Sequence, residues 1–560
     1  MRQSITFLVI CVLLLVGGAV SAASITDDAT NIEPTKSWTI QFNSAVDART
    51  VNEQTIYVTN NTQAEDIAVT YTVDGDTVQV SSVKPYNAGH TYTLIITNGV
   101  KSTTQLALAE QIEKKFTIQG AYATATVDAA GNVAATAHFT TFDEAMAARQ
   151  AGDVILRDGH IIYMERGVVS TTALITKLYT KPDLKLDYAG VTTHTEMLYV
   201  GATDEYVQVN FAGQMYYVKH QDILLLPNIP LQSYYSVTDA GLVHSIYNHN
   251  TKAFASYVVS AAPSFLQKGN KYYSTDGFTF YDEAGTFVGE SYSYFQYVSP
   301  RTVTSYSAEQ LDAYVMTVLA ERERSGVTRY KDATTKSALI GIGEQLKTIE
   351  AQSRINALLI LSLAIHEGDY GMSCHAQKYN NTFGLHVTDS NTACQNAPVD
   401  TTNKKYFSSI EKNIEAFAKH LNDTYLNVNN MANYIFNGLA FGNKMVGMNV
   451  RYATDPYWGA KAAGHMYRLD NALGGHDYKK HTLGITTQAY VSTRKAPSAT
   501  AERAYQYRVD GTIKRLDRMP LTLSTTPSHA ASWTRLVSEL QGYADDVYTV
   551  NANVRIIETH

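Results

Sequence analysis

The sequence predicts a multidomain protein, with all-β modules in its N-terminal half, a mainly α-helical domain after them, and a small β module at the C-terminal end. A chain of 560 residues has room for roughly three to five domains of ordinary size. Apolar residues alternate at every second position up to about residue 305 and recur with a helical period of about 3.6 over 306–480. The strand pattern returns over 484–560, so the changes of period mark the boundaries between modules.

The first 22 residues have the features of a secretory signal peptide. Arg2 supplies the positive charge, residues 5–16 form the apolar stretch, and the small residues 20–22 form the cleavage pattern. Cys11 lies inside the apolar stretch and follows Ile10, which argues against a lipid-anchored cysteine. Because no later apolar run reaches transmembrane length, we expect a secreted protein with no membrane contact after the signal is removed.

Residues 23–120 alternate short strands with turn residues, and this pattern is typical of a β-sandwich. The candidate strands are Trp38–Asn43, Thr55–Thr59, Val69–Val73 and Thr91–Ile96. The sequences of Ile40–Asp47 and Ala88–Leu94 resemble those of the immunoglobulin-like domains of surface and wall proteins of Gram-positive bacteria. By that resemblance the module acts as a spacer.

Residues 121–305 are also predicted to be mainly strands, and 173–227 has the strand order of a Src-homology-3-like barrel. A weaker signal predicts a second module of this kind at 484–560, which contains Trp533. In exported proteins such barrels usually hold an enzyme against the wall. The alternative is a packing module that binds no ligand, because fold does not determine function.

Residues 306–480 carry the helical pattern. Ser307 and Gln310 predict a capping box at the start of the first helix. Further helices are predicted over 355–367, around 410–421, and from Trp458 to the Gly474-Gly475 pair. The polar stretch 382–406 is predicted to be a loop or small hairpin. A helical body with such a lobe opposite an acid-bearing helix would form a cleft.

Glu367 ends the most apolar of these helices and is followed at once by Gly368. Since apolar residues occupy almost every side of the run from Ile355, the helix is expected to be buried all round. A carboxyl at its end would lie in a dry setting that favours the protonated form, as a general acid requires. The alternative is a glutamate that simply reaches solvent where the helix ends.

Three sequence blocks carry a specific resemblance. They are Ala364–Ser373, Ala376–Leu385, and Gly447–Trp458 with Lys461–Gly464. Together these blocks resemble the signature of bacterial endo-β-N-acetylglucosaminidases of glycoside hydrolase family 73. The resemblance implies a lysozyme-like fold for 306–480, peptidoglycan glycan strands as the substrate, and cleavage of the β-1,4 bond after N-acetylglucosamine. The flanking layout also resembles exported wall autolysins of bacilli, which implies a wall-associated protein of the Gram-positive type.

The resemblance assigns roles to individual residues. Glu367 occupies the position of the catalytic acid, and Tyr452 matches a tyrosine that faces the reacting sugar. The residues expected to contact substrate are Tyr370, Asn380, Asn381, Phe383 and Trp458. Asn380 and Asn381 are equally compatible with a structural role in a turn. Asp455 is expected to cap the helix that begins near Trp458.

The second carboxylate of the reaction is harder to place, because the chain has no glutamate between Glu367 and Glu411. Asp389 and Asp400 are the acids within the predicted lobe, and Asp389 is our choice. If neither is correctly placed, the acetamido oxygen of the substrate could attack the anomeric carbon instead. Retention and inversion of stereochemistry both remain open.

After removal of the signal only Cys374 and Cys394 remain, and in an oxidising compartment they are expected to form one disulfide. A thiol peptidase using Cys374 is the minor alternative. His366-Glu367 lacks a second histidine at the position of Tyr370, so a zinc protease is rejected, and we expect no metal and no cofactor.

Charge and composition exclude one further class and leave two competitors. The formal net charge is −7 and no basic patch suggests nucleic acid as a partner. The 39 tyrosines suit half-buried sheet faces and sugar stacking equally well. The alternatives to the glucosaminidase are a non-catalytic wall-binding or adhesive protein, and a muramidase or lytic transglycosylase with the same lysozyme-like fold. The oligomeric state and the physiological role are not predicted.

Overall fold

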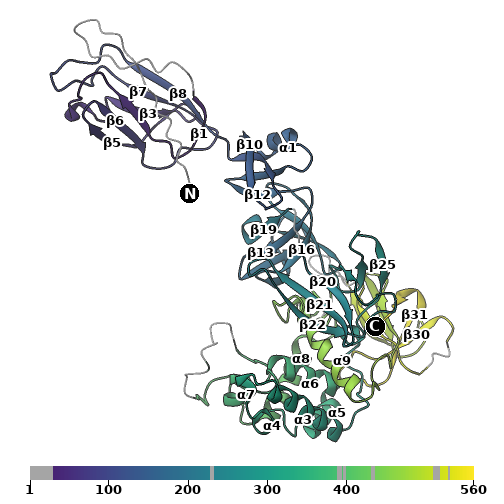
Figure 1. The fold of residues 1–560 in the computed structure, drawn as a ribbon. Coiled ribbons are helices and arrows are strands. Elements are labelled where there is room, and N and C mark those ends of the chain that lie inside the picture. The colour runs from purple at the N-terminus through teal and green to yellow at the C-terminus, as the bar shows by residue number, and fades with distance from the viewer. Residues whose placement is uncertain are drawn as a thin grey trace. The chain divides into compact units, whose positions relative to one another are not determined.

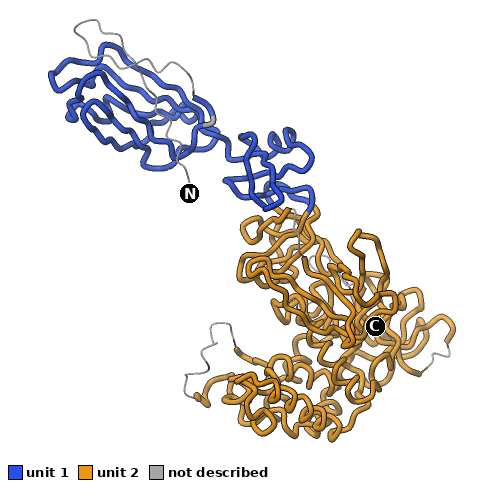
Figure 2. Tube along the Cα trace, in the orientation of Figure 1, with its two compact units in different colours: residues 1–166, 201–205 blue, residues 167–200, 206–560 orange. Residues whose placement is uncertain are grey.

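The computed structural model describes residues 29–227, 232–387, 394, 399–429, 435–508, 518–526 and 530–560. The predicted signal peptide lies outside these residues. The chain divides into two compact units, of which the first contains residues up to 166 with 201–205, and the second contains 167–200 with 206–560 (Figure 2). No helix among the described residues is long and apolar enough to cross a membrane.

The first unit begins with two packed sheets. The larger has the strand order β1-β8-β7-β3-β4 and the smaller has the order β2-β6-β5. Their bounds are β1 Ala29–Ile32, β2 Trp38–Gln41, β3 Ile56–Asn60, β4 Glu65–Ile67, β5 Val69–Asp74, β6 Thr77–Ser82, β7 Thr91–Ile96 and β8 Ile112–Ile118. Buried residues alternate along β3 and β7, and the inward side chains form one core that includes Trp38, Tyr92 and Phe116. This arrangement confirms the predicted β-sandwich.

A smaller four-stranded sheet of order β10-β9-β11-β12 completes the first unit. Its strands are β9 Tyr122–Val127, β10 Val133–Phe139, β11 Val154–Arg157 and β12 His160–Tyr163. Helix α1, Phe142–Ala148, packs against this sheet through Ala145. The sequence pattern predicted strands here and missed this helix, which a capping box between Thr141 and Glu144 initiates.

The second unit opens with a seven-stranded sheet of order β15-β14-β18-β17-β16-β13-β19. The strands are β13 Val168–Thr171, β14 Ile175–Tyr179, β15 Asp187–Thr192, β16 Glu196–Ala202, β17 Val207–Phe211, β18 Gln214–Val218 and β19 Ile223–Leu226. The strands predicted within 173–227 therefore form, and their identity as a Src-homology-3-like barrel stays a prediction. A second sheet and a hairpin follow, with β20 Tyr234–Thr238, β21 Gly241–Asn248, β22 Ala253–Ser260, β23 Lys271–Tyr272, β24 Thr279–Tyr281 and β25 Phe287–Glu290.

The helical domain follows the short helix α2, Tyr294–Tyr297. Its helices are α3 Ala308–Arg324, α4 Ala333–Lys336, α5 Gly343–Ser353, α6 Ala357–Glu367, α7 Cys374–Tyr379, α8 Ile410–Thr424 and α9 Trp458–Ala472 (Figure 1). The predicted capping box between Ser307 and Gln310 is present at the start of α3. Helix α6 is buried along residues 357–365, which confirms the prediction of a helix enclosed on all sides.

Helix α9 packs against α6 on one side and against β22 on another (Figure 1). Two glycines of α9 also allow close approach to neighbouring backbone, at β22 and at Gly442. A Cβ added at Gly464 would lie 2.2 Å from the carbonyl oxygen of Val258, and one added at Gly459 would lie 2.3 Å from the carbonyl oxygen of Gly442. The sequence Gly-Ala-Lys-Ala-Ala-Gly over 459–464 therefore brings the helix into direct contact with neighbouring backbone.

The predicted C-terminal β module is present as two small sheets, of orders β29-β26-β32 and β28-β27-β31-β30. The strands are β26 Leu483–Thr486, β27 Tyr490–Arg494, β28 Arg503–Arg508, β29 Pro520–Thr522, β30 Trp533–Leu536, β31 Val547–Val550 and β32 Val554–Ile556. The segment after β32 pairs with the entry to the helical domain, where the amide of Tyr292 donates to the carbonyl of Glu558 (2.9 Å). The multidomain layout predicted from the sequence is confirmed.

Candidate active site

Glu367 is the last residue of α6, and the chain turns sharply after it. The side chain of Asn356 accepts hydrogen bonds from the amides of Leu358 and Leu359, which fixes the start of the helix. At the other end Asp369, Tyr370 and Gly371 all adopt positive φ. Such a run is uncommon for residues with a Cβ, so the surrounding structure must hold this turn in place. The turn leaves the Glu367 carboxyl at the open end of an apolar helix.

The Glu367 carboxyl is half-buried and has one specific partner. The indole Nε1 of Trp458, at the start of α9, donates a 2.6 Å hydrogen bond to Oε1 of Glu367. Burial raises the pKa of Glu367; the Trp458 hydrogen bond opposes this, and the negative charge of Asp455 adds to it. The net effect is a raised pKa, as a group that must carry a proton to a leaving oxygen requires.

Tyr452 lies beside this pair. Its ring stacks on Trp458 with centroids 4.3 Å apart and an interplanar angle of 25°, and the ring of Tyr425 lies 5.1 Å away. Burial raises the pKa of Tyr452 well above its usual value, and the Glu367 charge raises it further. The phenol is therefore a protonated hydrogen-bond donor near the acid.

A buried lysine holds the loop that carries Tyr452. Lys444 is fully buried (0 % exposed), and its Nζ donates hydrogen bonds to the carbonyls of Asn449, at 2.8 Å, and Ala453. Burial lowers the pKa of Lys444 to about 7. The seven-stranded sheet supports the same loop, because Tyr216 Oη donates to the Lys444 carbonyl (2.7 Å).

Asp455 and Lys461 form an ion pair of 2.6 Å next to the acid. The other oxygen of Asp455 accepts the amide of Tyr457 (2.9 Å). Tyr457, rather than Asp455, is the residue at the N-cap position of α9, so the predicted cap is displaced by two residues although the carboxylate still binds a backbone N–H at the helix start. Burial and then Lys461 lower the pKa of His366 to about 4, which keeps this neighbour of Glu367 neutral.

Tyr370 follows the acid in sequence and packs in an aromatic and cationic setting. Its ring lies under the guanidinium of Arg322 (4.5 Å) and contacts the rings of Tyr330 (5.9 Å) and His465 (6.0 Å). These contacts orient the ring. Substrate contact by Tyr370 and by Trp458, which is 2 % exposed, stays a prediction.

Asn380 and Asn381 have most of their hydrogen-bonding groups occupied. Asn380 ends α7 with φ of 50° and donates to the carbonyl of Phe407 (2.9 Å). Asn381 is 1 % exposed, and its Nδ2 donates to the carbonyls of Leu385 (2.8 Å) and Lys405 (3.1 Å). These bonds correspond to the structural alternative considered from the sequence, and substrate contact remains untested. Phe383 is buried and stacks on Phe417 with centroids 3.8 Å apart, so it shapes the domain core.

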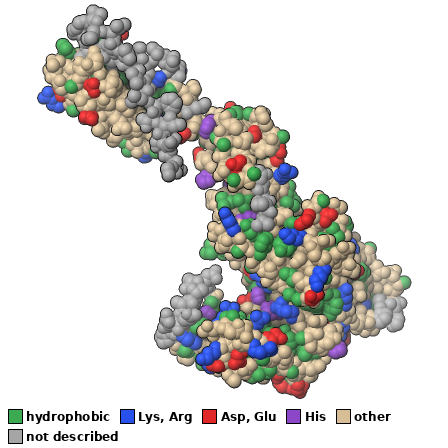
Figure 3. Space-filling view, viewed as in Figure 1, with side chains coloured by type: hydrophobic (Ala, Val, Ile, Leu, Met, Phe, Trp, Pro, Cys, Tyr) green, Lys and Arg blue, Asp and Glu red, His purple; other side chains and the backbone are tan. Residues whose placement is uncertain are grey.

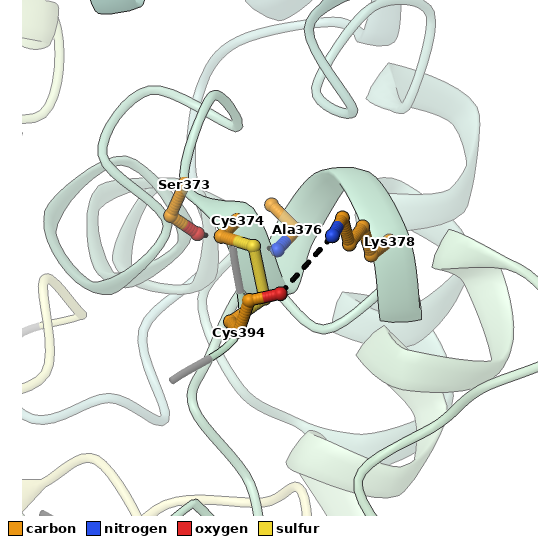
Figure 4. The surroundings of a disulfide bond; sticks show 5 residues. All are labelled: Ser373, Cys374, Ala376, Lys378 and Cys394. Atoms are coloured by element: carbon orange, nitrogen blue, oxygen red, sulfur yellow. Dashed lines mark hydrogen bonds between the residues drawn. A yellow bond between two sulfur atoms is a disulfide. The ribbon is translucent and has the colours of Figure 1, made fainter. Parts of the chain in front are cut away.

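The predicted disulfide between Cys374 and Cys394 is present (Figure 4). It joins the start of α7 to residue 394, and Lys378 Nζ donates to the Cys394 carbonyl (3.0 Å). Asp389, the predicted second carboxylate, lies outside the described residues. Asp400 is exposed, and its carboxylate binds the hydroxyl of Thr402 (2.7 Å).

Figure 3 shows a hollow between the helical domain and the β-sheets above it, with Lys, Arg and His side chains gathered at its inner end. The structural roles of two charged residues, Lys444 and Asp455, were not predicted from the sequence. Lys444 resembles an ordinary surface lysine in sequence, and Asp455 was expected only to cap a helix. The signal that could have drawn attention to them is their position: Asp455 lies within the third sequence block, 447–464, and Lys444 lies just before it.

Comparisons with known proteins agree with this geometry. Residues 18–118 match the model of a bacterial Ig-like domain, and residues 343–471 match the family described as mannosyl-glycoprotein endo-beta-N-acetylglucosaminidase. The match identifies a glycosidase domain within the chain. More specifically, residues 343–471 match the glucosaminidase model, in agreement with the resemblance of this region to glycoside hydrolase family 73.

Two curated proteins from different strains of Streptococcus pneumoniae, named by inference as endo-beta-N-acetylglucosaminidases, are each 32 % identical over 275 residues. The match covers 49 % of this chain and 36 % or 33 % of those proteins, so the chain spans about a third of their length. Autolysin E of S. aureus is 19 % identical, over 32 % of this chain and 72 % of that one, with a TM-score of 0.22.

Proposed function

We propose that this protein is an exported, wall-associated peptidoglycan hydrolase that cleaves the β-1,4 bond after N-acetylglucosamine. The observation that carries the proposal is the half-buried Glu367, whose pKa is raised and whose Oε1 is held by Trp458. The glucosaminidase match over 343–471 and the immunoglobulin-like domain, a type found in bacterial surface proteins, support the substrate and the location.

In this proposal Glu367 is the general acid. Its proton moves from the carboxyl to the glycosidic oxygen as the bond from that oxygen to the anomeric carbon breaks, and the carbon acquires oxocarbenium character. Tyr452 donates a hydrogen bond from its neutral phenol to the acetamido group or to the attacking water. Water supplies the hydroxyl that ends on the anomeric carbon, and its remaining proton passes to Glu367 if the configuration is retained or to the carboxylate on the opposite face if it is inverted.

The group that assists on the opposite face is proposed to be Asp389, with the substrate's acetamido oxygen as the alternative nucleophile. Tyr370, Asn380, Asn381, Phe383 and Trp458 are the proposed substrate-contact residues. The hydrogen bonds of Asn381 and the stacking of Phe383 on Phe417 favour an indirect role for these two residues, in shaping the cleft.

Mass analysis of the fragments released from purified sacculi tests the proposal. New reducing ends at N-acetylglucosamine are the expected result. Reducing ends at N-acetylmuramic acid would make the protein a muramidase, and anhydro-muramic ends would make it a lytic transglycosylase. Sacculi that are bound but not cleaved would make it a wall-binding protein without catalysis.

A further inference from the structure

A cavity of about 390 Å³ lies within the second unit, apart from the proposed catalytic acid. Residues of the seven-stranded sheet, of the β20–β25 region and of the start of α9 line it, and neither Glu367 nor Trp458 is among the described residues that do so. A cavity of this size can hold a small ligand, such as one sugar ring or one amino-acid side chain.

The lining combines aromatic rings with carboxylates. Tyr235, Tyr273, Tyr281 and Tyr457 supply rings, and Glu196, Asp276, Asp282 and Glu283 supply carboxyl groups. Among the described lining residues there is no lysine and no arginine. Rings with negative faces beside carboxylates attract a cation, and the same charges repel phosphate or carboxylate ligands.

Two largely buried side chains of the cavity wall, His244 and Tyr235, each have a polar atom with no described hydrogen-bond partner. His244 is 2 % exposed, and its Nδ1 binds the Tyr257 hydroxyl (3.1 Å), but no described residue bonds its Nε2. Tyr235, stacked on His244 with centroids 4.1 Å apart and 5 % exposed, has no described hydrogen-bond partner for its hydroxyl. Since both side chains line the cavity, these two atoms are available to form hydrogen bonds with a bound ligand.

The hydrogen-bonding character of the atoms that line the cavity indicates which kind of ligand fits there. Burial lowers the pKa of His244 to about 3, so the ring stays neutral; if Nδ1 carries the proton, Nε2 accepts. Asp276 accepts the amides of Phe278 (2.9 Å) and Thr279 (2.7 Å) and the Ser274 hydroxyl (2.9 Å), all through Oδ1. These bonds fix the carboxylate at the cavity wall.

We infer that this cavity binds a primary ammonium group, enclosed by tyrosine rings and neutralised by the carboxylates of the wall. Three N–H donors on one positive charge match the Asp276 carboxylate, whose described hydrogen bonds all use Oδ1, and, in the tautomer with the proton on Nδ1, His244 Nε2. In a wall hydrolase such an amine has two sources, an un-acetylated glucosamine unit or the side-chain amine of a stem peptide. The assignment of the source to the wall rests on the proposed function, whereas the preference for ammonium rests on the cavity alone.

The test measures binding by calorimetry on the full chain carrying Glu367→Gln, so that turnover does not interfere. The probes are a glucosamine trisaccharide, its fully N-acetylated form, a wall stem peptide with a free side-chain amine, and the same peptide acetylated there, all near pH 6, where the amines are charged. We expect at least one amine probe to bind about tenfold or more tightly than its acetylated form. The probe that does so identifies the source.

Variants locate the binding. Asp276→Asn should weaken it about tenfold or more. Because Asp276 also shapes its turn, the exposed pair Tyr281→Ser and Glu283→Gln at the same cavity is a second variant with little effect on folding. Asp239→Asn removes an equal charge from an exposed turn outside the cavity and should change nothing.

Equal binding of amine and acetylated probes, no saturable binding by either amine, or binding unaffected by both cavity variants would overturn the inference. Cleavage of sacculi by the wild-type chain is measured separately. If the wild-type chain does not cleave sacculi, the proposed function is wrong and the amine need not come from the wall. The inference that the cavity binds an ammonium group would still stand.

Discussion

The indole N–H of Trp458 lies 2.6 Å from Oε1 of Glu367, although 91 residues separate them in the chain. This bond joins the end of the apolar helix α6 to the beginning of α9. Two opposing effects act on the pKa of Glu367: the Trp458 hydrogen bond lowers it by stabilising the carboxylate, and burial raises it by favouring the protonated carboxyl. The predictions below separate these influences.

Glu367→Gln should abolish most glycan cleavage while leaving wall binding intact. A positioned general acid typically contributes about 10²–10⁴-fold in rate, so a loss of that order is expected. Release of reducing ends from sacculi measures the rate, and sedimentation with sacculi measures binding. Glu344→Gln, an exposed glutamate of the same domain, is the matched control. Full activity of the Glu367 variant would remove the proposed mechanism.

Trp458→Phe should move the alkaline limb of kcat/KM to higher pH. The Trp458 hydrogen bond lowers the pKa of Glu367, so its loss leaves the acid protonated to higher pH. The pH profile of kcat/KM is the measurement, since it remains interpretable even if the lost stacking on Tyr452 lowers the rate. Trp533→Phe, in the C-terminal module, should leave the limb in place. A shift to lower pH would contradict the assignment.

Asp455→Asn should shift the same limb in the opposite direction. The Asp455 charge raises the pKa of Glu367, and removing it also frees the positive charge of Lys461. Both changes favour the carboxylate, so the acid should lose its proton at lower pH. The surface variant Asp423→Asn serves as the control. If the Asp455 and Trp458 variants shifted the limb in the same direction, these electrostatic roles would be wrong.

Lys444→Met should lower stability by about 1–3 kcal/mol, because the buried carbonyl of Asn449 and the partly buried carbonyl of Ala453 lose their donor. The pKa of Lys444 falls from 10.5 to about 7 on folding, so between these values the unfolded chain binds more protons. Between pH 7 and pH 10.5 the free energy of unfolding of the wild type, relative to that of the variant, should therefore increase steadily as the pH rises. Denaturant unfolding at several pH values measures this, with the exposed Lys419→Met as the control. A stability difference that does not vary with pH would show that the amine keeps its ordinary pKa.

Replacing Cys374 and Cys394 together by alanine should destabilise the helical domain by about 3 kcal/mol. The bridge closes a loop with a sequence separation of 20, and the loop entropy of the unfolded chain gives that magnitude. Thermal unfolding with and without a reductant measures the effect. The reductant should lower the melting temperature of the wild type but not that of the double variant. An equal response of both proteins would mean that the bridge does not form.

The sequence predicted what depends on local patterns. The apolar run ending at Glu367, the capping box at Ser307 and the Cys374–Cys394 pair are all recognisable without any knowledge of packing. Helix α1 was missed because its seven residues lie between strands and are too short to show a helical period.

The remaining features of the site depend on contacts between distant parts of the chain. Asn381 occupies its amide with the carbonyl of Lys405, which is 24 residues away, and no local pattern can show whether that amide is free for a sugar. Lys444 is buried because loop carbonyls converge on it and the seven-stranded sheet supports its loop. A sequence scan treats such a lysine as a solvated surface residue.

Gly464 has a consequence for engineering this protein. Because α9 touches the backbone of Val258 at that point, the helix that carries Trp458 has one flank built from a different module. A fragment starting at residue 306 would lack β22, so the face of α9 that packs on this strand would be exposed to solvent. We therefore expect that the glucosaminidase region cannot be transferred alone, and that a chimera with a related protein should include strand β22.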